Sequence, residues 1–537
     1  MEHPSHAATQ LSRTLTSMLT DQTGLITGKA AVRSIKIEQE ERNEQHFKTD
    51  HLLPNLKRHT ISSGAVTISA QGAKFLLNVA STMILARLLL PWDFGLVAMV
   101  TTVTGFLRVF KDAGLSVATV QREKITHAQV SNLFWINVAV SLLSSLIVAV
   151  SAPVIAWFYR DPRLISITLL LSITFIVSGA TVQHRALLNR QMRFKALALI
   201  EVGSMAVGVL VGVAMALEGC RYWSLVGSNL SMEIAGLLLT WSLSRWRPQL
   251  PTRGSGIGPL VTFGAHRTAA GLIISLARGS DNLLIGRFYG AASVGLYSRA
   301  SAILMAPMDQ FLYPINTVFI PVLSRLQSYP ERYRSTFLRL FDATALTSFA
   351  FTGLFLALAR PITLVFLGPK WEQAAVIFGG LTVAALCVPL GNVCTWLFFS
   401  QGRGHDTLIA FSLNACVMIL SFIAGLPYGP VGVAIAFSAS SLLIRMPILY
   451  SIIGRRGPVR TADLWRVFFR HLPVWVVIFV ATWLTRSMVA DLRPLTQLLI
   501  CAPVGALIGG AYICAFRPQR QVAIHLLDSL RELKKKR

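Results

Sequence analysis

A stripe of polar side chains runs through the apolar segment 62–86. Its members recur every three or four residues, so they share one face of an α-helix. They are Thr67, Gln71, Lys74, Asn78 and Ser81. A charge retained inside such a segment usually faces a polar cavity, because its burial in hydrocarbon costs roughly 2.5–3.5 kcal/mol. The spacing therefore predicts that Gln71, Lys74 and Asn78 line a cavity in which Lys74 can bind an anion.

A second stripe follows at the same phase, at an offset of 267 − 67 = 200 residues. It consists of Arg267, Gly271, Ile274, Arg278 and Asp281. Guanidinium groups bind phosphate through forked hydrogen bonds, so Arg267 and Arg278 are candidate ligands of an anion, with Asp281 on the same stripe. The alternative is a structural role, in which Lys74 and Arg278 extend toward the membrane surface or Arg278 pairs with Asp281.

Four further charged residues lie within apolar segments: Glu233, Arg299, Asp309 and Arg445. We include Glu233 and Arg299 among the candidate binding residues, because a charge at membrane depth usually serves a function. Glu233 can balance an arginine in the cavity or bind a coupling cation, and it can equally be a buried structural partner.

No pattern typical of catalysis or of a cofactor stands out. The segment from Gly24 to Ala30 has the wrong spacing for a phosphate-binding loop and lacks its hydroxyl residue. There is no Ser/His/Asp or HExxH arrangement, and the six cysteines lack metal-binding spacing. We therefore predict no catalytic residues, no metal, no cofactor and no enzymatic activity.

Composition places both stripes in a membrane. Of the 537 residues 53% are hydrophobic and only 14% are charged, whereas soluble domains carry about 25% charged residues. Apolar runs of roughly 18 to 25 residues, long enough to cross a bilayer as helices, recur along the chain. They lie at about 62–86, 94–110, 133–157, 163–182, 196–217, 222–243, 258–279, 293–313, 341–367, 374–399, 406–426, 430–452, 467–489 and 495–515. The sequence predicts an all-α, polytopic membrane protein with about fourteen transmembrane helices.

The net charge of +26 would suggest nucleic-acid binding in a soluble protein. Here lysine and arginine concentrate in alternate loops, as expected of cytoplasmic loops. We therefore predict no nucleic-acid partner and place both termini in the cytoplasm. On the same argument, Arg160 and Lys370 lie on the outside.

The two halves of the chain share an ungapped repeat at the offset of 200 residues. The offset pairs Arg87 with Arg287, Gly95 with Gly295, and Asp93 with Ser293. The last pair suits the N-cap of a helix. Six spans in each half make the halves parallel, related by an axis along the membrane normal, and a binding site is expected between them.

Loop composition then divides the chain into six predicted units. These are a cytoplasmic, disordered tail (1–57), a first six-helix bundle (58–243), a cytoplasmic linker (244–257), a second six-helix bundle (258–453), a linker with two extra transmembrane helices (454–515) and a basic cytoplasmic tail (516–537).

Several segments resemble the polysaccharide transporter family (oligosaccharide flippases, Wzx-like) of the multidrug/oligosaccharidyl-lipid/polysaccharide (MOP) flippase superfamily. They are Ile84–Met99, Ala118–Glu123, Asp281–Gly290, Gly295–Ala300 and Leu312–Arg334. The likeness covers about residues 60 to 455, and the last two helices fit family members with a twelve-plus-two layout.

The resemblance implies a V-shaped pair of six-helix bundles that works by alternating access in a bacterial inner membrane, surrounded by membrane lipids. The implied substrate is a polyprenyl-pyrophosphate-linked oligosaccharide, moved outward for exopolysaccharide, capsule or lipopolysaccharide synthesis. A polysaccharide polymerase and a chain-length regulator are the implied protein partners. Lysine and arginine in a cavity suit this substrate, because they can neutralise its pyrophosphate.

Three other functions stay open at this point. The same superfamily contains cation-coupled multidrug exporters, but a cavity for cationic drugs would be dominated by acids rather than by lysine and arginine. A membrane-embedded polysaccharide polymerase or ligase would need a sizeable outer loop, and the outer loops here are short. A scaffold that transports nothing would not need the repeat or the charges inside the spans.

Overall fold

The structure is a computed structural model that describes residues 56–108, 115–122, 125–252 and 258–524. Within these ranges every regular element is a helix, so the all-α prediction is confirmed. Nearly all of the predicted N-terminal tail and the last part of the predicted C-terminal tail lie outside the described residues. Residues 517–524, the described part of the basic tail, are helical.

The first six predicted spans each coincide with one long helix. These are α2 (Leu56–Leu88), α3 (Pro91–Arg108), α5 (His127–Tyr159), α6 (Arg163–Arg190), α7 (Phe194–Leu217) and α8 (Trp223–Ser244). A short helix, α4 (Leu115–Gln121), lies in the connection between α3 and α5. The helix ends follow local chemistry. The side chain of Thr126, for example, accepts a hydrogen bond from the N–H of Gln129 at the start of α5, and the side-chain oxygen of Gln129 accepts one from the N–H of Thr126.

The next six predicted spans also form helices, but two of them lie in one helix, α9 (Gly258–Arg325), and the span 341–367 is divided between α10 (Pro330–Ala357) and α11 (Ala359–Leu367). The other elements are α12 (Glu372–Ser400), α13 (Gly404–Gly425), α14 (Gly429–Ser440), the π-helical turn η4 (Ser441–Arg445) and α15 (Met446–Gly454). Helix α9 joins two spans that the sequence separated, with a single break at Gly290, where φ is 76° and ψ is −177°. Leu90, one of the two residues between α2 and α3, lies 290 − 90 = 200 residues earlier, so the break falls where the repeat places a turn.

The two remaining helices, α16 (Thr461–Met488) and α17 (Pro494–Ala515), end the described membrane region. Polar contacts at three places along α16 join it to α10. Arg334 donates two hydrogen bonds, of 2.9 and 2.6 Å, to the carboxylate of Asp463. Arg470 and His471 both contact Asp342 at 2.9 Å, and Arg486 donates to the carbonyl of Ala357 at 2.7 Å. The contacts are spread along α16, so it cannot swing independently of α10.

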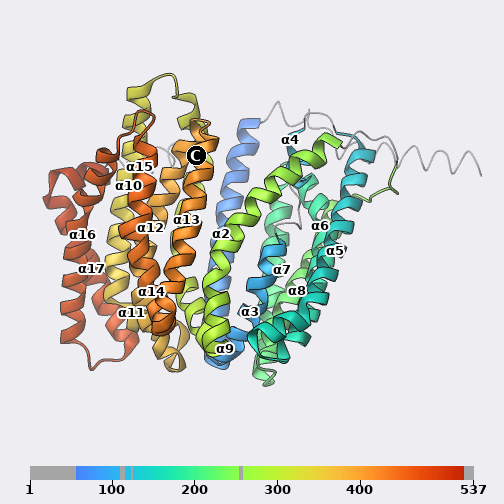
Figure 1. The fold of residues 1–537 in the computed structure, drawn as a ribbon, viewed down its shortest axis with the longest axis horizontal. Helices are drawn as coiled ribbons and strands as arrows, with labels where there is room; N and C mark the ends of the chain where they lie inside the picture. Colours follow the sequence, from blue (N-terminus) through green and yellow to red (C-terminus); the bar gives the residue numbers. More distant parts are fainter. Residues whose placement is uncertain (1–55, 109–114, 123–124, 253–257, 525–537) are drawn as a thin grey trace, which may run out of the picture.

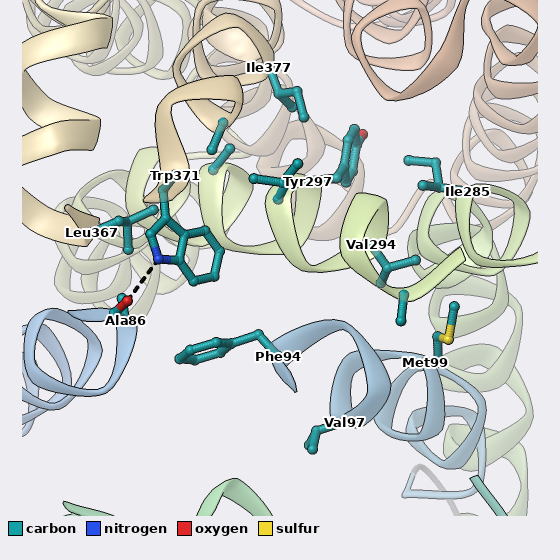
Figure 2. Packing of buried hydrophobic residues seen from close by; sticks show 14 of the residues in the cluster. Ala86, Phe94, Val97, Met99, Ile285, Val294, Tyr297, Leu367, Trp371 and Ile377 are labelled. Atoms are coloured by element: carbon teal, nitrogen blue, oxygen red, sulfur yellow. Dashed lines mark hydrogen bonds between the residues drawn. The ribbon is translucent and has the colours of Figure 1, made fainter. Parts of the chain in front are cut away.

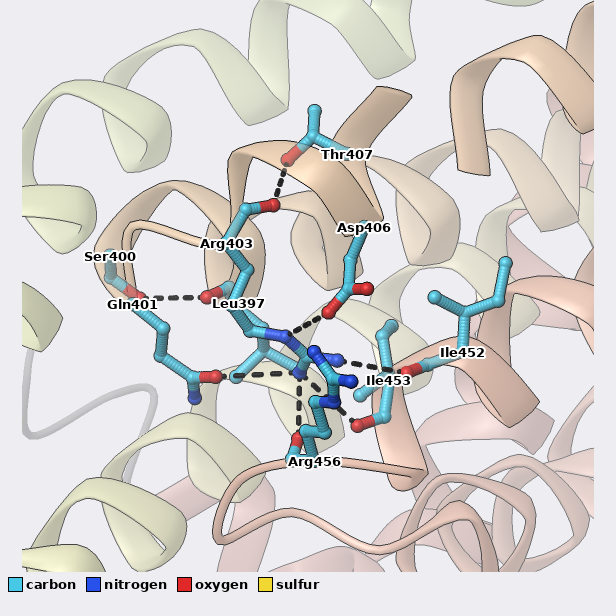
Figure 3. Close-up of polar contacts among 9 residues, drawn as sticks. All are labelled: Leu397, Ser400, Gln401, Arg403, Asp406, Thr407, Ile452, Ile453 and Arg456. Atoms are coloured by element: carbon cyan, nitrogen blue, oxygen red, sulfur yellow. Dashed lines mark hydrogen bonds and ion pairs between the residues drawn. The ribbon is translucent and has the colours of Figure 1, made fainter. Parts of the chain in front are cut away.

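Arg403 ties the turn between α12 and α13 to the connection between α15 and α16 (Figure 3). Its guanidinium donates to the carboxylate of Asp406 at 2.7 Å. It also donates to the backbone carbonyls of Ile452, Ile453 and Arg456 at 2.9, 3.3 and 2.6 Å. Carbonyls at the end of a helix have no partner within the helix, so Arg403 satisfies acceptors that α15 leaves open.

Length and hydropathy allow eight helical stretches of the described residues to cross a membrane, and one of them, 404–454, contains both α13 and the helix from α14 to α15. The protein is thus a multi-pass membrane protein, and the predicted count of about fourteen helices is consistent with the structure. In Figure 1 the helices α3 to α8 form one group and α10 to α17 the other, and the groups converge at the lower end beside α9.

Candidate functional site

The two groups of helices meet through a reciprocal backbone contact at the start of α3 and at the bend of α9. A Cβ atom on Gly95 would lie 1.7 Å from the carbonyl oxygen of Ala291, and one on Gly295 would lie 1.8 Å from that of Pro91. The four residues form two pairs at the repeat offset, since 95 + 200 = 295 and 91 + 200 = 291. Each half therefore presents the same surface to the other, as a two-fold relation requires.

Side chains complete this contact, which we call the closed end (residues 86–99, 285–300 and 365–371). The indole of Trp371 donates to the carbonyl of Ala86 at 2.8 Å and packs edge-on against Phe94, with ring centroids 5.3 Å apart (Figure 2). Arg87 donates to the carbonyl of Val365 at 3.0 Å, and Lys370 donates to the carbonyl of Arg87 at 3.3 Å. Buried apolar side chains from α3, α9 and α12 fill the space around them, so this end is sealed.

Lys74, the central residue of the first predicted stripe, pairs with an acid that the sequence analysis missed. Its ammonium lies 2.9 Å from a carboxylate oxygen of Glu201 on α7, and the two side chains are 32% and 36% exposed. An ion pair with this exposure is open to exchange with an external anion. The sequence does contain a feature that could have pointed to Glu201, because it is the one charged residue in the apolar segment 196–217.

The other candidates in the first half of the chain lie on α2 and α8. Gln71 is half-buried and Asn78 is exposed, both on α2 with Lys74. Glu233 is half-buried on α8. Arg185 of α6 approaches α8 at Gly236, where its Nη2 atom would be 3.2 Å from a Cβ atom on the glycine. The predicted binding role of these residues is not tested by their positions and stays a prediction.

The second-half candidates fall in three places. The positions of Arg267 and Arg278 belong to α9, but their side chains lie outside what the structure describes. Asp281 accepts hydrogen bonds from the N–H of Asn282, at 2.7 Å, and from the hydroxyl of Tyr297. Arg299 lies over the ring of Phe94, 5.2 Å from its centroid, so it crosses from α9 to α3 at the closed end.

Asp281 and Tyr297 also line a cavity of about 560 Å³ inside the second group of helices. The cavity lies between α9, α12, α13 and the turn η4, and its volume is in the range of small-molecule sites, about 300–1,000 Å³. Its other polar side chains are Ser301, Asn392, Thr395, Asn414, Ser441 and Arg445. Arg445 is recognisable from the sequence as a charge inside a span, but it was not among the predicted binding residues.

Comparison with known proteins places these features in a family. Residues 84–376, more than half of the chain, match the family described as "Polysaccharide biosynthesis protein". The chain belongs to this family. The resemblance to polysaccharide transporters that the sequence motifs indicated is thereby confirmed.

Individual relatives of the chain are also named for the biosynthesis of polysaccharides. The lipopolysaccharide biosynthesis protein WzxC of Escherichia coli (strain K12) is 25% identical over 438 residues, which are 79% of this chain and 87% of WzxC. The succinoglycan biosynthesis transport protein ExoT of Rhizobium meliloti (strain 1021) is 28% identical over 359 residues, 66% of this chain and 71% of ExoT.

Among solved structures, the lipid II flippase MurJ in an inward closed conformation has a similar fold. It superposes with a TM-score of 0.65 at 15% sequence identity, covering 83% of this chain and 98% of MurJ. This likeness shows that the chain shares the helical fold of MurJ.

Proposed function

We propose that the protein translocates polyprenyl-pyrophosphate-linked oligosaccharides across the bacterial inner membrane for exopolysaccharide, capsule or lipopolysaccharide synthesis. The observation that carries this proposal is the family match over residues 84–376, whose relatives are named for polysaccharide biosynthesis and, in ExoT, for transport. The protein acts as a transporter rather than as an enzyme in this proposal, and a polymerase and a chain-length regulator would receive its product.

The charges inside the helices suit such a substrate. A pyrophosphate must be neutralised before it can cross hydrocarbon, and Lys74 can do so by exchanging Glu201 for the substrate. Arg267 and Arg278, on the equivalent stripe of α9, would provide the matching contacts from the second half. An inside-negative potential also favours outward movement of an anion, by about 2.3 kcal/mol per charge per 100 mV.

Alternating access needs two bodies that separate at one end while they meet at the other. We propose that residues 58–243 and 258–453 are these bodies, and that the linker 244–257 joins them on the cytoplasmic side. The closed end contains Arg87 and Lys370, which the loop charges place outside. The structure would then correspond to a state that is sealed toward the periplasm.

A cation-coupled multidrug exporter is the alternative within the superfamily, and no observation favours it. The half-exposed charge on α2 is a lysine, and Arg445 adds a second cation in the cavity of the second half. Arg445, which forms no ion pair with a described residue, would repel a cationic drug. A polymerase or ligase would require an acceptor site outside the membrane, for which the described connections between helices are short.

Reconstitution tests the proposed function directly. Purified protein in liposomes should expose an inner-leaflet, polyprenyl-pyrophosphate-linked oligosaccharide to a lectin or a glycosidase added outside, at a rate that grows with protein content. Liposomes that carry a heat-denatured sample are the control. No exposure above this control, together with efflux of a cationic dye by the same vesicles, would replace the proposal with the multidrug alternative.

Topology supplies a separate prediction. With both termini in the cytoplasm, a cysteine placed at Lys370 should react with a membrane-impermeant maleimide in cells whose outer membrane alone is permeabilised. A cysteine at Arg332, which is exposed and lies on the predicted cytoplasmic side, should react only after the inner membrane is opened. The reverse pattern would invert the orientation and turn the closed end toward the cytoplasm.

A further inference from the structure

The side chain of Arg445 contacts only neutral groups among the described residues. Its Nε atom donates to Oδ1 of Asn414 at 2.6 Å, and its Nη1 atom donates to the hydroxyl of Ser441 at 2.8 Å. Its guanidinium also lies over Phe437, 5.0 Å from the ring centroid. Among the described residues no carboxylate forms an ion pair with it, and Nη2 donates to no acceptor.

Local backbone geometry holds Arg445 at the cavity. The turn η4 is π-helical and is inserted between α14 and α15, so the helix carries an extra residue at this point. Single π-helical turns of this kind are rare inside α-helices and frequently lie at functional sites. Here the turn ends at Arg445 and places both Ser441 and Arg445 on the cavity wall.

The carboxylate that shares the cavity is already engaged. Asp281 accepts hydrogen bonds from Asn282 and from the hydroxyl of Tyr297, all on α9. No ion pair joins Asp281 to Arg445, which lines the cavity from the turn η4. A cation within a membrane-spanning bundle is costly unless an anion pairs with it. Arg445 has no such partner among the described residues, and an anion supplied from outside would offset that cost.

Two amides add hydrogen-bond donors beside this cation. Since a guanidinium only donates, Asn414 must turn its oxygen to Arg445, which leaves its NH₂ group to donate to a ligand. Asn392, on α12, lines the same cavity, and its side chain bonds to no described residue. Nη2 of Arg445 and the two amide groups are together the donor set that a phosphate oxygen needs.

Most of the remaining cavity wall is apolar. Helices α12, α13, α14 and α15 contribute these apolar side chains, which are Leu381, Phe411, Met418, Phe422, Phe437 and Leu449. Phe399 and Leu413, which also line it, are 53% and 42% exposed, so the cavity can be reached from the protein surface. A cationic corner in a largely apolar cavity fits a ligand with a charged head and an apolar body.

We propose that this cavity binds the phosphate head group of an amphiphile, with the phosphate on Arg445 and the first part of the apolar chain against the aromatic wall. The site is separate from the Lys74–Glu201 pair and does not depend on the proposed transport activity. Two sources share the ligand chemistry: a polyprenyl phosphate or pyrophosphate, and an anionic phospholipid.

The test measures binding by the purified full-length protein in phosphatidylcholine nanodiscs, with farnesyl diphosphate as the probe. Wild-type protein should bind the probe and gain thermal stability from it. Arg445→Gln should weaken binding by about tenfold or more, because it removes the charge and the fork. Asn392→Leu should weaken it several-fold. Arg360→Gln, which removes an exposed arginine paired with Glu372, is the matched control and should bind like the wild type.

Competition then defines the ligand class. Farnesol and inorganic pyrophosphate should each bind far more weakly than the probe. Displacement of the probe in nanodiscs that contain phosphatidylglycerol would support the site and assign it to bulk lipid, and retention of the probe would assign it to the polyprenyl carrier. Unchanged binding by Arg445→Gln, or equally tight binding of inorganic pyrophosphate, would overturn the proposal. If Arg445→Gln does not fold, Asn392→Leu and Arg445→Lys, which keeps the charge without the fork, decide the same question.

Discussion

Lys74→Glu should abolish most export of lipid-linked sugar while the protein still reaches the membrane. The substitution removes the cation proposed to bind pyrophosphate and puts a second carboxylate next to Glu201, which lies 2.9 Å from the lysine ammonium in the wild type. A hydrogen bond to a charged group contributes roughly 1.5–3 kcal/mol. Export per folded molecule should thus fall roughly ten- to hundredfold. Two quantities are measured, and each is divided by the abundance of the protein in the membrane. Polymer export should fall, and lipid-linked units should accumulate on the cytoplasmic leaflet.

Variants of the partner separate substrate binding from packing. The double variant Lys74→Ala/Glu201→Ala removes both charges of the ion pair, so neither is left without its partner. Its abundance in the membrane should therefore exceed that of Lys74→Ala alone, while its export stays low. Glu201→Gln leaves the lysine in place and should export at least as well as the wild type. If the double alanine variant exports normally, the pair only supports packing, and the proposed role of Lys74 is wrong. Lys74→Arg should be milder than Lys74→Glu.

Gly95→Ala should prevent the closed end from forming. Its methyl group would lie 1.7 Å from the carbonyl oxygen of Ala291, a distance that no packing can accommodate. Helix α3 must therefore move away from α9. A cysteine at Val294, which is fully buried at this end in the wild type, should become reactive toward an impermeant maleimide added from outside. Export should stop, because a transporter that cannot seal one end cannot alternate.

The repeat gives this experiment two internal comparisons. Gly295→Ala should behave like Gly95→Ala, because its methyl group would meet the carbonyl of Pro91 at 1.8 Å. Gly105→Ala, on the same helix α3, adds a methyl group where there is open space and should leave both labelling and export unchanged. Normal export by Gly95→Ala, with Val294→Cys still protected, would show that the backbone contact is not needed for transport.

The helices could be predicted from sequence because each apolar run must satisfy its own backbone hydrogen bonds in lipid. Their ends followed from polar connections, and most of the twelve spans up to residue 452 match one helix each. The exceptions are the joined α9 and the span 341–367, which is divided between α10 and α11 and whose first helix begins already at Pro330. The join could not be foreseen. A glycine at a turn looks the same in sequence whether it ends a helix or bends one, and only packing against α3 decides between them. Asp93 was expected at an N-cap. Instead its carboxylate accepts from the N–H of Leu90, which makes it the third residue of the first turn of α3.

The site was harder to predict than the fold, because its pairs cross between helices. The stripe on α2 could be read from its spacing, but the Lys74–Glu201 contact spans 127 residues of chain. Arg445 stands in a similar position: its orientation depends on the π-helical turn, and its partner Asn414 lies on another helix. Periodicity shows which residues share a face, and it does not show which faces meet.

The attachment of α16 to α10 has a practical consequence for single-molecule work. A fluorophore on α17 reports the motion of the second group of helices, because α16 and α17 pack together and α16 is held to α10 along its length. The native thiol of Cys514 is exposed near the end of α17 and is ready for labelling once the other exposed thiol, Cys416, is replaced. A second dye at Ser242, exposed near the end of α8, completes the pair. Energy transfer between these two dyes would change as the two groups of helices separate and approach. It would thus follow opening and closing in real time, without a label near the Lys74–Glu201 pair or the Arg445 cavity.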